Sequence, residues 1–129
     1  MNRQRITVAA VAAGLAAVTT AGLIANSAQA QSAGELFQKK CMSCHSPTAT
    51  VPANLKGPAL NGIVGKKIAG QKGYEYSAAL KAKTGNWTDA NLDAFLASPK
   101  TFAPGTKMIP STADPAQRKM IIEHMKTLK

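Results

Sequence analysis

Two cysteines and one histidine stand close together in the run Cys41-Met42-Ser43-Cys44-His45. This C-x-x-C-H spacing is typical of covalent haem attachment. Cysteines three residues apart at the end of a helix project to the same side, so each sulfur can form a thioether with one haem vinyl group. The following histidine is then near enough for a ring nitrogen to reach the iron. The motif predicts one haem c, attached through Cys41 and Cys44, with His45 as an iron ligand.

Other uses of the two thiols fit the sequence less well. They are the only cysteines in the chain, and a disulfide between them would close a loop too short to restrict the unfolded chain much. A thioredoxin-like redox pair requires a βαβ setting, and the sequence shows no such pattern. A tetrahedral zinc site needs four ligands, whereas the chain has two Cys and two His and no third thiol.

Residues 1–30 differ in composition from the rest of the chain. A basic start with Arg3 and Arg5 precedes the nearly uncharged run Ile6–Ile24, and the stretch closes with the A-x-A sequence Ala28–Ala30. This order predicts a secretory signal peptide, cleaved after Ala30, and a periplasmic mature protein without membrane insertion. The apolar run is also close to bilayer-spanning length, so a retained anchor stays an alternative. Its weak hydrophobicity and the A-x-A ending favour cleavage.

The remaining residues, 31–129, suffice for one domain and leave no room for a second. The whole chain carries a formal net charge of +10, from 16 Lys and Arg against 6 Asp and Glu. Its lysines are dispersed without a block of like charge, which indicates a solvated basic surface and argues against a nucleic-acid partner. Such a surface serves either solubility alone or steering toward an acidic partner. We expect a monomer.

The elements that position the motif are predicted to be helices joined by long loops. A capping box at Ser32 and Glu35 begins a helix that leads into the cysteines. Caps and apolar spacing predict further helices over residues 77–83, 88–98 and 114–128. Stretches rich in Pro and Gly, residues 46–73 and 100–113, are predicted to be irregular. Because three Phe, two Tyr and one Trp make a thin core, we expect the loops to wrap a large apolar cofactor.

Further motifs extend over nearly all of residues 33–128. They are Gly57-Pro58-x-Leu60-x-Gly62, Gly73-Tyr74-x-Tyr76, Trp87, Pro99-Lys100 and Pro104-Gly105-Thr106-Lys107-Met108. Together with the C-x-x-C-H run, they make the sequence similar to class I c-type cytochromes, the small soluble mitochondrial and bacterial type. The resemblance implies an all-α cytochrome c fold, with four to five short helices and long loops around one covalently bound haem.

The resemblance also implies roles for individual residues around the haem. Met108 matches the family's sixth iron ligand, and the Pro58 carbonyl matches the acceptor of a hydrogen bond from the second ring nitrogen of the iron-bound histidine. Tyr76 and Trp87 match positions that hydrogen-bond a haem propionate, and Thr106 matches one beside the propionates and the methionine. Residue type alone also allows ordinary core packing for each of these three.

Two residues compete for the sixth position on the iron. Of the methionines that follow the leader, Met108 alone lies in a loop free to close over the opposite haem face. His124 is the rival and would give bis-histidine iron. Its place on the apolar stripe of the last predicted helix favours a packed, structural role.

The sequence departs from the family pattern at three places. Lys66 stands near a position where relatives often carry an Arg that pairs with a propionate, so bidentate pairing is lost there. Leu80 replaces an Asn that often holds a buried water near the methionine. Where the first and last helices cross, the family sets Gly against an aromatic residue, and this chain is expected to offer Ala33 and His124.

Ligation by His45 and Met108 would fill both axial positions of the iron and leave none for a substrate, which predicts an electron carrier and not an enzyme. Lys40, Lys100 and Lys107 match family positions around the exposed haem edge, where they would dock acidic-faced redox proteins such as an oxidase, a cytochrome reductase or a dehydrogenase. Two alternatives stay open. One is a five-coordinate, peroxidase-like or gas-binding haem protein, and the other is a cytochrome dedicated to one periplasmic dehydrogenase.

Overall fold

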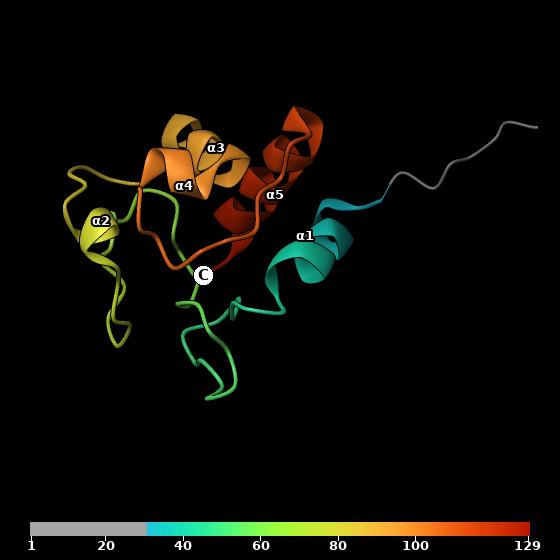
Figure 1. Cartoon of the computed structure of the whole chain (residues 1–129). Helices are drawn as coiled ribbons and strands as arrows, with labels where there is room; N and C mark the ends of the chain where they lie inside the picture. The colour runs from blue at the N-terminus through green and yellow to red at the C-terminus, as the bar shows by residue number, and fades with distance from the viewer. Residues whose placement is uncertain (1–30) are drawn as a thin grey trace, which may run out of the picture.

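The computed structural model describes residues 31–129, so the predicted signal peptide, residues 1–30, lies outside the described residues. The chain forms short helices connected by long loops (Figure 1): α1 (Ala33–Cys41), α2 (Ala78–Lys81), α3 (Asp89–Ala97), α4 (Pro99–Phe102) and α5 (Pro115–Thr127). Within residues 31–129, β structure amounts to one isolated bridge between Lys67 and Asn86. No helix in this part of the chain combines the length and the apolar character that crossing a bilayer requires.

The helices begin where the sequence supplies capping residues. The Ser32 hydroxyl accepts a hydrogen bond from the Glu35 amide, and the Glu35 carboxylate accepts one from the Ser32 amide, so the predicted capping box is present. Thr88 caps α3. Asp114 caps α5, with Pro115 in its first turn. These bonds satisfy amides that have no partner within the helix, which is why the sequence predicts these three starts well.

Two predicted boundaries are wrong. The helix expected over residues 77–83 ends at Lys81. The stretch expected to be irregular from residue 100 begins with α4, because Phe102 packs into an aromatic cluster. The Phe102 ring stacks on Trp87 with centroids 5.8 Å apart, and it meets Phe95 edge-on at 5.5 Å. A long-range aromatic contact thus stabilises a turn of helix that local sequence did not indicate.

Helices α1 and α5 lie side by side in Figure 1 and pack directly on each other. Phe37 of α1 and Ile121 of α5 are fully buried. The His124 ring lies 4.8 Å from the Phe37 ring, centroid to centroid. The small residue that faces His124 is Gly34 and not Ala33, as the sequence had led us to expect: a Cβ atom at Gly34 would lie 3.5 Å from Cε1 of His124. Ala33 and Gly34 are adjacent on the helix, and only the way α1 packs on α5 determines which of them faces His124.

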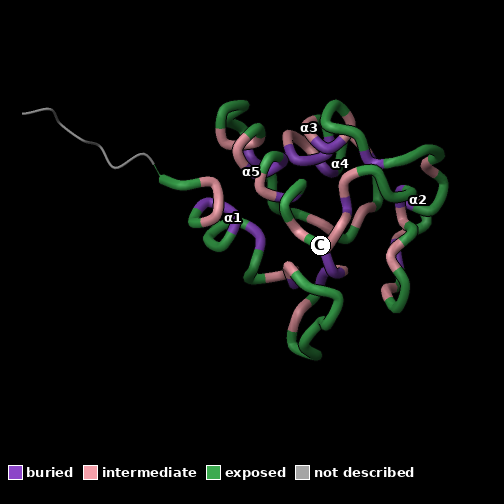
Figure 2. The backbone as a smooth tube through the Cα atoms, turned by 180° about the vertical axis from the view of Figure 1, so that it is seen from behind, coloured by how far each residue is buried: buried purple, intermediate pink, exposed green. Residues whose placement is uncertain are grey.

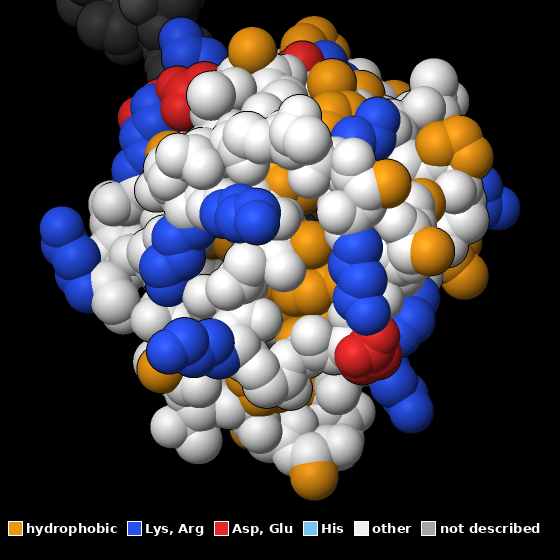
Figure 3. Space-filling view, turned by 90° about the vertical axis from the view of Figure 1, so that its left-hand side faces the viewer, with side chains coloured by type: hydrophobic (Ala, Val, Ile, Leu, Met, Phe, Trp, Pro, Cys, Tyr) orange, Lys and Arg blue, Asp and Glu red, His pale blue; other side chains and the backbone are white. Residues whose placement is uncertain are grey.

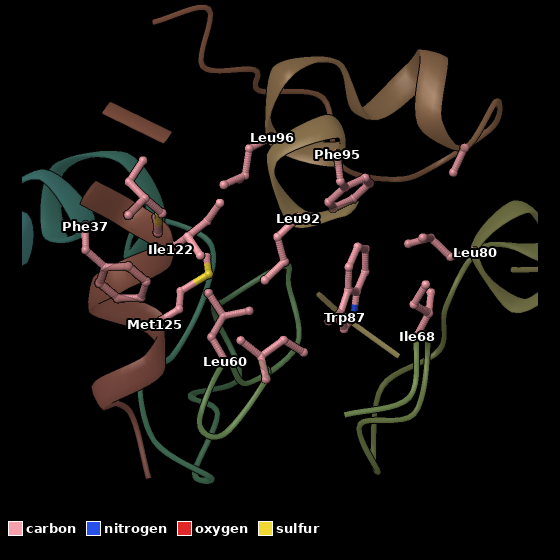
Figure 4. Packing of buried hydrophobic residues seen from close by; sticks show 14 of the residues in the cluster. Phe37, Leu60, Ile68, Leu80, Trp87, Leu92, Phe95, Leu96, Ile122 and Met125 are labelled. Atoms are coloured by element: carbon pink, nitrogen blue, oxygen red, sulfur yellow. The ribbon is translucent and has the colours of Figure 1, made fainter. Parts of the chain in front are cut away.

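The buried side chains form a single cluster that reaches from this helix pair to α3 and to the loops. Figure 2 shows the buried stretches where the elements face one another, with exposed stretches toward the periphery. In Figure 4, Phe37, Ile122 and Met125 occupy one end of the cluster, and Trp87, Phe95 and Ile68 the other. Leu60 and Leu92 lie between them. Loop residues therefore supply much of the interior.

Candidate functional site

The attachment run forms a tight turn at the end of α1. The helix ends at Cys41, and the amides of Cys44 and His45 both donate to the Cys41 carbonyl, at 3.1 and 2.9 Å. Both cysteines are free, with Cys41 buried and Cys44 half-buried. Burial raises the pKa of the Cys41 thiol to about 11, with the nearby Lys40 acting in the opposite direction. The turn therefore presents two unpaired sulfurs and an imidazole from five consecutive residues.

The imidazole of His45 is fixed by the loop that follows. Its Nδ1 lies 2.9 Å from the Pro58 carbonyl oxygen, which can only accept, so the proton is on Nδ1. Nε2 is left with its lone pair, as iron ligation requires. Burial lowers the pKa of His45, and the bond to Pro58 opposes that shift in part. The resemblance predicted this bond, and the structure contains it.

Backbone hydrogen bonds tie the same loop to the attachment turn. The Gly57 amide donates to the Cys44 carbonyl at 2.8 Å, and the Leu60 amide donates to the Ser46 carbonyl at 2.8 Å. Gly57 lies directly against the imidazole, since a Cβ atom there would be 2.4 Å from Cε1 and 2.5 Å from Nδ1 of His45. Only a residue without a side chain fits between the loop and the ring.

These groups open onto one apolar cavity of about 380 Å³. Its wall includes Cys41, Cys44, His45, Pro58, Leu60, Ile63, Tyr74, Tyr76, Leu80, Trp87, Leu92, Phe95, Leu96, Thr106, Met108 and Met125. Figure 3 shows a hollow on one face of the molecule in which hydrophobic side chains are visible, with Lys or Arg side chains around it. An apolar wall, two thiols and a neutral imidazole on one side fit a flat, apolar, covalently attached ring with a metal at its centre.

Every residue that the sequence predicts to touch the cofactor lies in this wall. Tyr76 and Trp87 are buried there, with 8% and 6% of their surfaces exposed. Thr106 also lines the cavity, and its hydroxyl accepts a hydrogen bond from the Met108 amide at 3.3 Å. Tyr74, which the sequence singled out only as part of a motif, meets Tyr76 edge-on with ring centroids 4.8 Å apart.

The two candidates for the sixth ligand occupy different places. Met108 lines the cavity from the loop between α4 and α5. His124 is not among the described residues of the cavity wall, because its ring is packed against Phe37 and Gly34 between α1 and α5. The structure therefore brings Met108, and not His124, to the same cavity as His45.

The departures from the family pattern have structural counterparts. Lys66 Nζ donates to the Asn61 carbonyl and to the Gln71 side chain, both at 3.0 Å. Leu80 is buried, with 7% exposed, and belongs to the cavity wall. An aliphatic side chain thus occupies the position at which the resemblance had implied a polar one.

The predicted docking lysines divide into two groups. Lys40 and Lys107 lie at the cavity, whereas Lys100, on α4, is exposed and is not among the described residues that line it. Lys107 also donates to the Glu75 carbonyl, so it joins the Met108 loop to the loop that carries Tyr74. Lys56, which the sequence did not single out, also lines the cavity beside Gly57. Its position next to the Gly57-Pro58 motif was the available signal.

Comparison with known proteins agrees with this geometry. The Cytochrome c family model matches residues 30–129. The chain is 41% identical to "Cytochrome c-type cyt cy" of Rhodobacter capsulatus over 103 residues, which cover 77% of this chain and about half, 49%, of that protein. It is 41% identical to "Cytochrome c-554" of Methylosinus trichosporium over 104 residues, 81% of this chain and 77% of that one. The solved structure "cytochrome cH from Methylobacterium extorquens" superposes with a TM-score of 0.64 and 41% identity, over 74% of this chain and 95% of its own.

The fold, the attachment turn and these matches place the molecule among helical haem proteins with one covalently bound cofactor. The chain belongs to the cytochrome c family. Its cofactor is haem c, and it is a monohaem electron-transfer protein and not an enzyme, as the sequence predicted. The predicted cytochrome c fold is likewise confirmed.

The close approach of Gly57 to His45 predicts a strong effect of one added methyl group. Gly57→Ala must displace the imidazole or the loop, so we expect the haem-loaded protein to lose about 1–3 kcal/mol of unfolding free energy. Gly34→Ala is the matched control, because its Cβ atom would meet His124 at ordinary contact distance and alanine favours the helix by up to about 1 kcal/mol. Denaturant unfolding of both variants measures this, and equal effects would contradict the assigned role of Gly57.

Proposed function

We propose that this chain is a periplasmic electron carrier in which His45 and Met108 bind the haem iron from opposite sides. The supporting observation is that both side chains line one apolar cavity. The haem supplies a one-electron couple when bound. His45 offers Nε2 while Pro58 holds its Nδ1 proton, and Met108 offers a soft, neutral thioether that favours the ferrous state. Two side-chain ligands would leave the iron no position for a substrate.

The ligand assignment predicts the behaviour of a Met108→Ala variant. The native ferric protein should show a methionine-to-iron charge-transfer band, and its ferrous form should bind no carbon monoxide at neutral pH. Met108→Ala should lose the band and gain carbon monoxide binding, because one axial position opens. Met120→Leu is the matched control, since Met120 is half-buried on α5 and is not among the described cavity residues. Carbon monoxide binding by the native protein would instead support the five-coordinate alternative.

The proposed partners are acidic-faced redox proteins, such as an oxidase, a cytochrome reductase or a dehydrogenase of a respiratory chain. All six acidic residues of the chain lie among residues 31–129, where each accepts a hydrogen bond or forms an ion pair. The salt bridges of this part of the chain use Lys81, Arg118 and Lys126. Lys40 and Lys56 at the cavity make no salt bridge there, so their charge is available to steer an anionic partner.

Steering at the cavity can be measured with a small anionic oxidant. Oxidation of the ferrous protein by hexacyanoferrate(III) should slow by a factor of about three in Lys40→Gln or Lys56→Gln at low ionic strength, because a charge near the point of electron exit is lost. Lys100→Gln and the control Lys119→Gln should change the rate less, since neither residue lines the described cavity. The differences should vanish at high salt. Equal effects of all four substitutions would show that net charge alone sets the rate.

The periplasmic location rests on residues 1–30 and has its own test. When the full chain is expressed with a working haem-attachment system, the haem-loaded protein should appear in the periplasmic fraction with Gln31 as its first residue. Recovery from the membrane fraction with Arg3 and Arg5 still present would favour the retained anchor.

A further inference from the structure

Arg118, in the second turn of α5, joins three segments of the chain through one guanidinium group. Its Nε donates to Asp93 Oδ1 of α3 at 2.7 Å. Its Nη1 donates to the carbonyl oxygens of Thr112 and Ala113, at 3.0 and 2.6 Å. Only 11% of the Arg118 side chain is exposed, although arginine is normally a surface residue. This burial and the number of bonds indicate a specific role for the group.

The two carbonyls belong to the end of the loop that carries Met108. At its beginning, this loop is anchored by Ala103, which is fully buried and accepts a hydrogen bond from the Thr106 amide at 2.9 Å. At its end, the Thr112 amide donates to the Leu96 carbonyl of α3 at 2.8 Å. Between these anchors Ile109 is 70% exposed. Met108 itself packs against the buried cluster, and Lys107 beside it donates to the Glu75 carbonyl, so the anchors at both ends act together with these contacts to place Met108.

We propose that Arg118 is a positioning residue for Met108, which it keeps at the cavity by fixing the end of this loop to Asp93 on α3. The inference rests on the proposed ligation of iron by Met108. A ligand on a loop competes with free ligands through its effective concentration, which falls when the loop gains freedom. The planar guanidinium can bond the Asp93 carboxylate and both carbonyls at once, whereas a lysine ammonium cannot reproduce that geometry.

Competition with imidazole tests this role. Imidazole binds ferric iron only after Met108 leaves, and loss of the charge-transfer band follows its binding. In Arg118→Gln we expect the affinity for imidazole to rise by about tenfold, the size of one lost charge-assisted hydrogen bond. In Arg118→Lys the affinity for imidazole should rise less, because lysine retains the positive charge. In Asp93→Asn the affinity for imidazole should also rise. This second variant allows the test even if Arg118→Gln does not fold.

A destabilised variant outside the loop separates positioning from general stability. Phe37→Leu removes volume from the buried contact of α1 with α5, so it should lower the unfolding free energy and leave the imidazole affinity unchanged. If the native protein shows the charge-transfer band but the imidazole affinity is unchanged in both Arg118→Gln and Asp93→Asn, the positioning role of Arg118 is overturned. The proposed ligation by Met108 is then unaffected. Absence of the band from the native protein would overturn the ligation by Met108, and this inference with it.

Discussion

Ten of the seventeen buried hydrophobic residues described in residues 31–129 line the wall of one cavity, and this constraint organises the fold. Four of the five helices described in residues 31–129 contribute to that wall with seven residues, and the loops between them contribute sixteen. α1 brings Cys41, α2 brings Leu80 and α5 brings Met125. A small domain with short helices has little other interior to bury. Folding and cofactor binding are therefore coupled, because the same side chains serve both.

Attachment and orientation are achieved by different kinds of structure. The thiols and the imidazole come from one tight turn, so their spacing is set by the local backbone. The direction of the imidazole depends on the Gly57–Pro58 loop, which approaches from twelve or more residues away and bonds it through backbone atoms. His45 thus has backbone support on its side of the cavity and the Met108 loop is anchored at both ends, an arrangement that would limit movement of the two side chains. Small rearrangement is what electron transfer requires of a protein.

Local sequence predicted the features that depend on nearby residues. The C-x-x-C-H run needs only five consecutive positions, and the starts of α1, α3 and α5 follow from caps such as Ser32 and Asp114. Features that depend on distant contacts were missed or misplaced. α4 exists because Phe102 packs on Trp87, and Gly34 rather than Ala33 meets His124 because of how α1 and α5 cross. No periodicity contains that information.

Resemblance supplied what periodicity could not, although not for every residue. The four residues to which it assigned contacts with the haem, Pro58, Tyr76, Trp87 and Thr106, all line one cavity, because family motifs record long-range contacts as well as local ones. It treated Lys40, Lys100 and Lys107 as one docking group, although their surroundings differ. Lys100 is not among the described residues that line the cavity, and Lys107 donates to the Glu75 carbonyl. Surface charge is set by neighbours in space, and family motifs constrain it less than the core.

The acidic and basic residues of the chain have different roles, because the carboxylates are paired within the fold and most lysines are not. Its few carboxylates accept hydrogen bonds from amides at helix starts, as Glu35 and Asp114 do, or hold elements together, as Asp89 does with Lys126 and Asp93 with Arg118. Each acidic group is thereby placed beside a positive partner or a helix N-terminus, where its field is largely compensated. The excess of lysine is left on the surface, partly around the cavity mouth. The proposed steering of an anionic partner would act through this uncompensated charge.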